Sequence, residues 1–522
     1  MEASTGLYWL LVAGGAIAVA WVARRRGWPA PLLLVLAGLV VSPLVPSIKL
    51  EPELILYVFL PPLLYSAALE SSYLSLRENK RAIGMLSVGL VLFTTLVVGG
   101  VVHLLLPDLP LAAAFALGAI IAPPDAVAAV AVGRRLGLPR RPLTILIGES
   151  LFNDATALTV YRVAIGAVVG HGISLIEGVG EFLYTAVGGV LIGLAVALAS
   201  GWLLGRTRDA LVENTVMLLI PFATYLGAES VHASGVIAVV IVGLYLGYRM
   251  HRTGAGTRVL LSSVWKVVDF MLESIVFALI GLQLVPVLSG LAGRSPWEVA
   301  GYVLAIFAVT VLARFVWVFP SAYLPLLWLK SAPRPPWQHV VIVGWAGMRG
   351  VVSLAAAFAI PEGFPERDLL LFLTFSTVIL TLLVQGLTFP TLIRKLRVSS
   401  EREEYEDNLS EAAAQQAAVE AGLARLEEVL REEPGDQIHG EVIDMLRQKS
   451  ERRALTAWER LGGGTGQGGA ETPSRLYRRL RREMLAAERE VLVRLRDERR
   501  LDDEVLRRVT AELDFEEAIL ER

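Results

Sequence analysis

The sequence contains no cysteine and few charged residues for its length. Without cysteine the chain can form no disulfide bond, thiolate metal site or cysteine nucleophile. Of its 522 residues, 19% are Asp, Glu, Lys or Arg and 54% are hydrophobic, and the mean hydropathy is +0.58. A soluble domain of this size could not bury so much apolar surface. The composition therefore predicts a membrane protein.

Charge is distributed unevenly along the chain. Residues 401–522 hold 21 Lys and Arg against 30 Asp and Glu, whereas the first 400 residues hold 27 against 20. We therefore expect a transmembrane domain at residues 1–395 and a cytoplasmic, mostly helical tail at residues 396–522. Gly462 to Gly469 is expected to be a flexible linker within the tail. A regulatory or dimerising tail and a merely solvated appendage both remain possible.

The first apolar run, from Gly6 to Ala23, is followed by Arg24, Arg25 and Arg26. A signal peptide carries its positive charge before the apolar run, so this segment is predicted to be a retained first helix. Because about 20 apolar residues cross the hydrocarbon core as a helix, the chain predicts an all-α membrane protein of about thirteen transmembrane segments. These are residues 7–23, 29–46, 52–70, 83–105, 110–133, 141–169, 174–204, 210–227, 233–248, 258–286, 297–323, 338–361 and 366–393.

Basic residues alternate between the connections of these segments. Lys and Arg accumulate on the cytoplasmic side of short loops. Every second connection, starting after the first segment, is basic, and together these connections carry twenty basic residues against three in the others. The alternation predicts an N-terminus outside and a tail inside the cell.

Ionisable residues within the apolar segments are few, and each is costly in a membrane and therefore a functional candidate. They are Glu70, Asp125, Glu149, Asp154, Arg162, Lys266, Asp269, Glu273, Arg314 and Arg349.

Segment six places Asp154 past the middle of its helix, about 20 Å from Arg141. Ser150 and Asp154 are four residues apart and share one strip of the helix, as Glu149 and Asn153 share another. A carboxylate supplemented by hydroxyl, amide and carbonyl oxygens suits a hard cation such as sodium. The same carboxylate, when empty and desolvated, favours the protonated form. We expect protons and a monovalent cation to compete for Asp154, although a purely structural ion pair is the alternative.

Segments five and twelve contain signals that interrupt a helix. Pro123 and Pro124 precede Asp125 in segment five, and a glycine-dense stretch surrounds Arg349 in segment twelve. Broken helices at equivalent places in two halves of opposite orientation predict an inverted repeat with a binding site between the breaks. Arg349 is expected to pair with Glu149, leaving Asp154 free to titrate. Pairing with Asp154 itself would argue against that mechanism.

Three stretches together resemble a known family. GESLFNDATA in segment six, APPDAVA in segment five and GMRGVVSLAAA in segment twelve are similar to signatures of the NhaP-like sodium/proton antiporters. These belong to the cation:proton antiporter family, which includes the animal sodium/proton exchangers. The resemblance covers roughly residues 1–395.

The resemblance implies two crossing broken helices, elevator-like movement and a homodimer in the cell inner membrane. It implies that Asn153 and Asp154 bind the ion, with Ser150 and the backbone near Ala122 as further ligands. Glu149 and Arg349 would form a bracing ion pair. The Asn-Asp form in this family goes with electroneutral one-for-one exchange.

Several positions depart from the family pattern. Pro123-Pro124-Asp125-Ala126 stands where many relatives have Thr-Asp-Pro, so a hydroxyl ligand there is not assigned. Ser66 stands where relatives often carry an acid, and the nearest acid is Glu70, for which a role at the ion entrance and no role are both open. Lys266, Asp269 and Glu273 are expected to form an internal ion-pair network, with a functional role for Glu273 as the alternative.

Two arginines, Arg162 and Arg314, have no assigned partner. They either pair with acids of segment ten or extend their side chains outward to the membrane interface.

Other functions fit less well. An intramembrane aspartyl protease could use Asp125 and Asp154, but the Gly-x-Gly-Asp setting is absent and the breaks would be unexplained. A channel would need no titratable site between broken helices. We therefore expect a non-enzymatic antiporter of Na⁺ and H⁺ with the lipid bilayer as its environment, no cofactor and no nucleic-acid partner. Potassium and lithium remain open as the cation.

Overall fold

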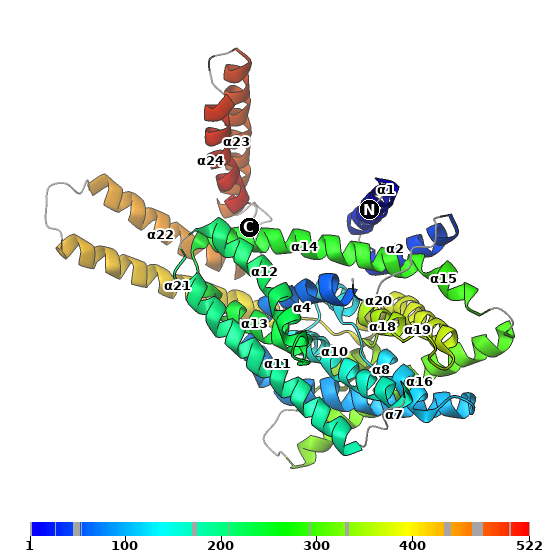
Figure 1. Ribbon diagram of the computed structural model, residues 1–522. Helices are drawn as coiled ribbons and strands as arrows, with labels where there is room; N and C mark the ends of the chain where they lie inside the picture. The colour runs from blue at the N-terminus through cyan, green and yellow to red at the C-terminus, as the bar shows by residue number, and fades with distance from the viewer. Residues whose placement is uncertain are drawn as a thin grey trace. The chain divides into compact units, whose positions relative to one another are not determined.

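A computed structural model describes residues 3–26, 28–44, 53, 55–169, 175–207, 209–291, 294–328, 334–432, 440–461, 473–498, 500 and 503–520. Helices account for all regular secondary structure in these ranges (Figure 1). The chain divides into two compact units, Met1–Ser399 and Ser400–Arg522.

The N-terminal unit contains mostly long helices. In chain order these are α1 (Ala3–Arg26), α2 (Ala30–Val41), a π-helical turn leading into α4 (Leu60–Glu70), α5 (Tyr73–Glu78), α6 (Lys80–Gly84), α7 (Val91–Leu105), α10 (Arg140–Val169), α11 (Leu175–Leu204), α12 (Ala210–Glu229), α13 (Gly235–Arg249), α14 (Ala255–Leu282), α15 (Leu284–Ser289), α16 (Pro296–Trp328), α19 (Arg367–Leu380) and α20 (Gly386–Leu396). A π-helical turn joins α6 to α7, and another joins α19 to α20.

Two helix pairs are interrupted where the sequence predicts it. The first pair is α8 (Leu111–Ile121) and α9 (Val127–Arg135), and the second is α17 (Trp337–Trp345) and α18 (Val351–Phe358). Prolines remove backbone donors in the first break, and the second break is rich in glycine.

A helix or an interrupted pair occupies each of the thirteen predicted segments within the described residues. By length and hydropathy alone, five of the described helices qualify as membrane spans: Lys80–Leu105, Glu177–Leu204, Ala210–Glu229, Pro296–Leu324 and Arg367–Leu396. The other segments include the short halves of the broken helices and the charged helices α10 and α14. Thirteen as the number of spans stays a prediction.

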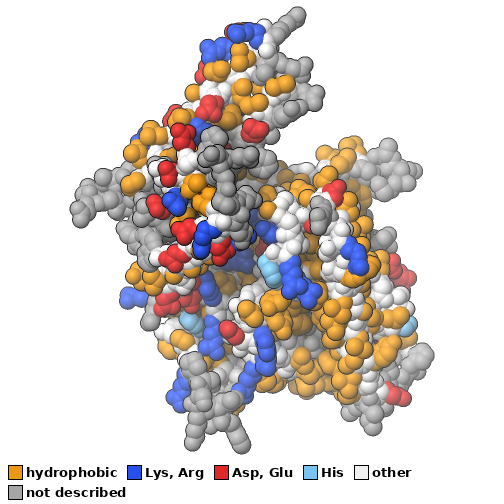
Figure 2. Space-filling model, turned by 90° about the vertical axis from the view of Figure 1, so that its left-hand side faces the viewer, with side chains coloured by type: hydrophobic (Ala, Val, Ile, Leu, Met, Phe, Trp, Pro, Cys, Tyr) orange, Lys and Arg blue, Asp and Glu red, His pale blue; other side chains and the backbone are white. Residues whose placement is uncertain are grey.

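Large apolar side chains are exposed on the outer helices, as expected of a lipid-facing surface. On α11 they recur at successive turns, at Val179, Leu183, Tyr184, Val187, Leu191, Leu194, Leu198 and Trp202. Figure 2 shows hydrophobic side chains covering much of one face of the molecule. The exposed surface of this unit therefore suits a bilayer.

The half-helix α8, which precedes the first break, is buried within this unit. Its buried side chains include Ala113, Leu117 and Ile121. At Gly118 an added Cβ would lie 2.5 Å from the carbonyl oxygen of Thr95 on α7, so the two helices pack at the closest distance that glycine permits. This packing holds the break beside α10.

The C-terminal unit consists of two helical pairs, α21 (Glu401–Glu432) with α22 (Gly440–Leu461), and α23 (Pro473–Asp497) with α24 (Asp503–Leu520). The predicted linker at Gly462 to Gly469 lies outside the described residues. Arg481 of α23 donates to both carboxylate oxygens of Glu516 on α24, each at 2.7 Å. This pairing lowers the pKa of the Glu516 carboxyl below its ordinary value.

Candidate functional site

The carboxylate of Asp154 stands at the centre of the candidate site. Asp154 lies in α10, about 21 Å along the helix from Arg140, and only 7% of it is exposed. Among the described residues its carboxylate accepts no hydrogen bond and forms no salt bridge. A buried carboxylate without a fixed partner is available to a proton or a cation.

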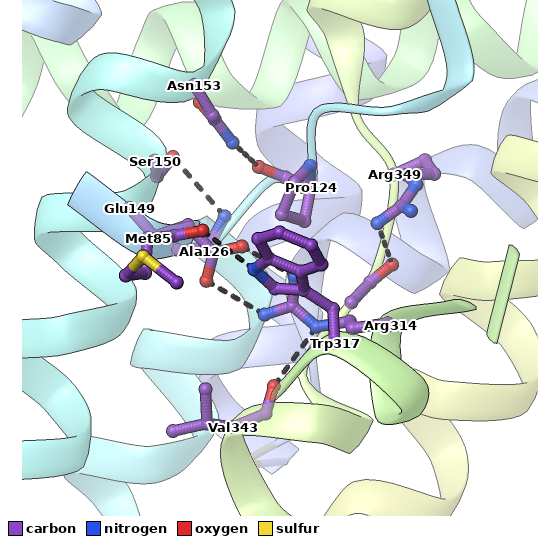
Figure 3. A network of polar contacts seen from close by, with 11 residues as sticks. Met85, Pro124, Ala126, Glu149, Ser150, Asn153, Arg314, Trp317, Val343 and Arg349 are labelled. Carbon is purple, nitrogen blue, oxygen red and sulfur yellow. Dashed lines mark hydrogen bonds and ion pairs between the residues drawn. The ribbon is translucent and has the colours of Figure 1, made fainter. Parts of the chain in front are cut away.

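Asn153 connects α10 to the first break. Its side-chain nitrogen donates to the carbonyl oxygen of Pro124 at 2.7 Å (Figure 3). That nitrogen is therefore a brace for the broken helix. The side-chain oxygen of Asn153 is buried and has no hydrogen-bond partner within the described residues, so it remains available as a neutral ligand.

The two breaks contact each other through Asp125. Its backbone N–H donates to the carbonyl oxygen of Met348 in the second break, at 2.7 Å. Its carboxylate accepts from the N–H of Val127 at 2.9 Å and so satisfies a free donor in the first turn of α9. An added Cβ at Gly350 would collide with the Asp125 carboxylate. The broken helices therefore meet beside Asp154, and Gly350 permits the approach.

A cavity of about 320 Å³ opens beside this contact. It brings together most of the residues predicted from the sequence, and its lining includes Ser66, Glu70, Asp125, Ser150, Asp154 and Glu273. The hydroxyl of Ser150 lies 3.5 Å from the N–H of Ala126, a long contact. Ala122 packs against Val91 and Ala157 and does not line the cavity.

The predicted pairing of Glu149 with Arg349 is wrong. Glu149 is bound instead by Arg314 of α16, whose Nη1 and Nη2 donate to the two carboxylate oxygens at 2.5 and 2.8 Å (Figure 3). Arg314 also donates from Nε to the carbonyl oxygen of Val343 at 3.1 Å. That carbonyl lies in the last turn of α17, where the helix leaves acceptors free and favours a cation. These contacts position Arg314 for a two-pronged bond to Glu149.

Arg349 stays within its own break. Its Nη1 donates to the carbonyl oxygen of Gly347 at 2.7 Å, and its backbone N–H donates to the hydroxyl of Thr381 at 3.0 Å. Only 1% of Arg349 is exposed. Its side chain thus turns back onto the loop and braces the second break.

The predicted ion-pair network in α14 is also wrong. Within the described residues no salt bridge joins Lys266 to Asp269 or Glu273, and one oxygen of Asp269 is buried without a partner. Asp269 faces Ser66 of α4 and lines the Asp154 cavity together with Glu273. An acid from α14 thus lies near the place where the family pattern expects an acid on α4.

Three residues of the site were not assigned from the sequence. Arg314 is a charged residue in an apolar segment, where an unpaired charge is costly. That cost is the sequence signal that Arg314 has a buried acidic partner, which the structure shows to be Glu149. Asp269 carried a weaker signal, its spacing of four residues from Glu273. Ser353 lines the cavity, and its buried hydroxyl has no hydrogen-bond partner in the part of the chain that the structure describes. The sequence offers no signal for it beyond its closeness to the break.

The partner of Arg162 is Glu229 of α12, at 2.8 Å, so the alternative of pairing with an acid of segment ten is wrong for this residue. This pair lies outside the cavity lining. Arg162 therefore takes no part in the candidate site.

Comparisons with known proteins identify the family and the fold. Residues 12–395 match the family model described as "Sodium/hydrogen exchanger, transmembrane". An uncharacterised Na⁺/H⁺ exchanger of Mycobacterium tuberculosis is 32% identical over 98% of this chain and 95% of its own length. A sodium, potassium, lithium and rubidium/H⁺ antiporter of Bacillus subtilis is 32% identical over 70% of this chain and 58% of its own length.

A solved structure shares the fold. The sodium proton antiporter MjNhaP1 from Methanocaldococcus jannaschii superposes with a TM-score of 0.61 and 22% identity. The match covers 76% of this chain and 99% of that one. The region matched is of the size of the N-terminal unit.

Proposed function

The chain belongs to the sodium/hydrogen exchanger family, and on this basis we propose that it exchanges a monovalent cation, sodium in the first place, for protons that compete for Asp154. Members of the family are multi-pass membrane transporters, not enzymes. The proposal concerns the chemistry and the movement by which this chain performs the exchange.

The environment of Asp154 carries the proposal. Its carboxylate is buried, free of salt bridges among the described residues, and open to a cavity beside two broken helices. A proton and a sodium ion neutralise the same carboxylate and therefore exclude each other. Binding of one drives release of the other, which is the coupling that an antiporter needs.

Neutral oxygens around Asp154 would complete the cation site. Ser150 lines the cavity. Asn153, whose side-chain oxygen has no hydrogen-bond partner within the described residues, precedes Asp154 in the sequence. Broken helices also leave backbone carbonyls, such as that of Ala122, without helical partners. Asp125 supports the site by fixing the break. Glu70, Asp269 and Glu273 line the same cavity and would attract cations toward Asp154.

The charge balance favours electroneutral exchange. Glu149 is neutralised by Arg314, and Asn153 carries no charge. With Asp154 as the exchanging carboxylate, one sodium ion replaces one proton. A second exchanging carboxylate would instead allow net charge to move.

The larger movement is proposed to follow the fold. The two breaks belong to an inverted repeat, and the helices that carry them would shift together in an elevator-like step. We further propose a homodimer in the cell inner membrane, with the N-terminus outside and the tail in the cytoplasm, where the tail would regulate exchange. The alternation of basic loops supports this orientation.

Potassium/proton exchange is the second candidate. The B. subtilis relative is named for sodium, potassium, lithium and rubidium, so cation choice within the family is not uniform. Selectivity depends on small differences in cavity geometry and oxygen number.

A vesicle assay tests the proposal. Proton movement in response to sodium, lithium or potassium would be followed in sealed vesicles across a range of pH, with the membrane potential clamped and unclamped. We expect sodium-dependent proton flux that is insensitive to the clamp. A flux that changes with the imposed potential would contradict electroneutral exchange, and no flux with any cation would contradict the function.

A further inference from the structure

A second, larger cavity adjoins the Asp154 cavity. It measures about 1010 Å³ and shares Val127, Ala131, Arg134, Asp269, Glu273 and Phe277 with the smaller one. Its basic lining residues come from four helices, α1, α9, α14 and α20, and are Arg24, Arg25, Arg26, Arg134, Arg135, Lys266 and Arg394. Among the described residues, the acids that line it are Asp269 and Glu273.

This excess of positive charge does not suit the proposed cargo. Acidic or neutral groups line cation pathways, because clustered positive charge repels the ion. Within the described residues no salt bridge joins Arg24, Arg25, Arg134 or Arg394 to a carboxylate. A bound anion would compensate these charges.

An apolar groove leads away from the same arginines. It measures about 700 Å³, shares Arg24, Arg25 and Phe270 with the basic cavity, and is otherwise lined by Gly14, Ile17, Ala18 and Trp21 of α1. Those four positions lie on one face of a helix. The Arg24 guanidinium lies 5.2 Å from the centre of the Phe270 ring, and the Arg25 guanidinium lies 5.6 Å from the centre of the Trp21 ring. Both arginines are therefore held where the groove meets the cavity.

The groove has the length of an acyl chain in one leaflet. From Gly14 to Arg25, α1 rises about 16 Å, and half of the hydrocarbon core is about 15 Å. A free phosphate ion would occupy the basic cavity and leave the groove unused. A phospholipid with a negatively charged headgroup fits both parts at once.

We propose that an anionic phospholipid binds to this protein, with its phosphate at Arg24 and Arg25 and an acyl chain along the Gly14, Ile17, Ala18 and Trp21 groove. The placement in the cytoplasmic leaflet rests on the orientation proposed above. The headgroup would contact basic residues of α1 and of α9, the half-helix that begins at Val127 beside Asp125. The lipid thereby links α1 to the half-helix that follows the first break.

Binding by the full-length chain in detergent tests the proposal. Native mass spectrometry would measure titrations with dioleoylphosphatidylglycerol, dioleoylphosphatidylcholine and inorganic phosphate. The variant R24Q/R25Q is expected to weaken binding of phosphatidylglycerol about 30-fold, since each basic residue near anionic lipid contributes about fivefold. The matched control is R206Q/R249Q, which removes two arginines that also stack on aromatic rings but lie outside the cavity.

A second variant tests the groove separately. Gly14 and Gly15 both have open space where a Cβ would be placed, but only Gly14 lines the groove. We expect Gly14→Leu to weaken phosphatidylglycerol binding and Gly15→Leu to leave it unchanged. Both variants should fold, because a Cβ at either position meets nothing within 4 Å.

Four results would overturn the proposal. The first is equal binding of the two phospholipids, and the second is an equal loss of binding in the control variants. The third is binding of inorganic phosphate as tight as that of the lipid. The fourth is a change in the number of subunits per complex in Gly14→Leu without a change in the lipid bound per chain. The last would make the groove an interface between copies. Because binding is measured without transport, it is judged independently of whether the chain exchanges sodium for protons.

Discussion

Glu149 and Arg314 form a buried, two-pronged ion pair across 165 residues of sequence. Each side chain is 1% exposed. The pair neutralises Glu149 and leaves Asp154, five residues further along α10, without a cationic partner among the described residues. This separation of a structural carboxylate from an exchangeable one underlies the proposed mechanism.

Replacing Arg314 tests this separation. Arg314→Gln leaves Glu149 buried and unpaired, which costs about 3–5 kcal/mol of stability, whereas Arg349→Gln keeps the pair. We expect a large loss of thermal stability in detergent for the first variant, and partial recovery in E149Q/R314Q. The control is Arg162→Gln, which removes a partly exposed pair with Glu229 and should cost about 1 kcal/mol or less. Wild-type stability of Arg314→Gln would show that the pair is not structural.

Asn153→Ala removes the hydrogen bond to Pro124 and one neutral oxygen next to Asp154. The lost bond alone costs about 0.5–1.5 kcal/mol. We expect the KM for sodium to rise in the vesicle assay. Asn214 is the matched control, since it is also buried and donates to backbone carbonyls, but these are at Ala210 and Thr257 and not in a broken helix. An equal KM change in Asn214→Ala would assign the effect to general destabilisation.

Gly350→Ala places a methyl group against the Asp125 carboxylate. Overpacking of this kind costs about 1–3 kcal/mol and separates the two breaks. We expect exchange to fall strongly. Gly301→Ala is the control, because its Cβ meets nothing within 4 Å and alanine within a helix is favoured by about 0.5–1 kcal/mol. Normal exchange in Gly350→Ala would mean that close contact of the breaks is not required.

Asp269→Asn removes one carboxylate from the lining of both cavities. If it contributes about 1 kcal/mol of attraction, the KM for sodium rises about fivefold while kcat is kept. Asp108→Asn, an exposed position outside the cavity, controls for the change of net charge. A fall in kcat with unchanged KM would assign Asp269 to the transport step and not to attraction.

Local features of this chain could be predicted from the sequence, and distant pairings could not. The breaks at Pro123-Pro124 and around Arg349 depend on proline and glycine within a few residues, so they are predictable from the sequence. The structure confirms their positions. The partner of Glu149 depends on how α16 lies against α10, and two arginines were available to it. Asp269 reaches Ser66 from a helix about 200 residues away, which helical spacing within one segment does not reveal.

Sodium-dependent proton flux in sealed vesicles, measured at several pH values for the wild type and Asp154→Asn, tests the central claim most directly. A lower pH fills Asp154 with protons, so the account predicts that the KM for sodium rises as pH falls while the maximal rate at saturating sodium is kept. Asp154→Asn should show no flux, and Asp108→Asn should behave as the wild type. Full exchange by Asp154→Asn, or a KM for sodium independent of pH, would contradict competition at Asp154.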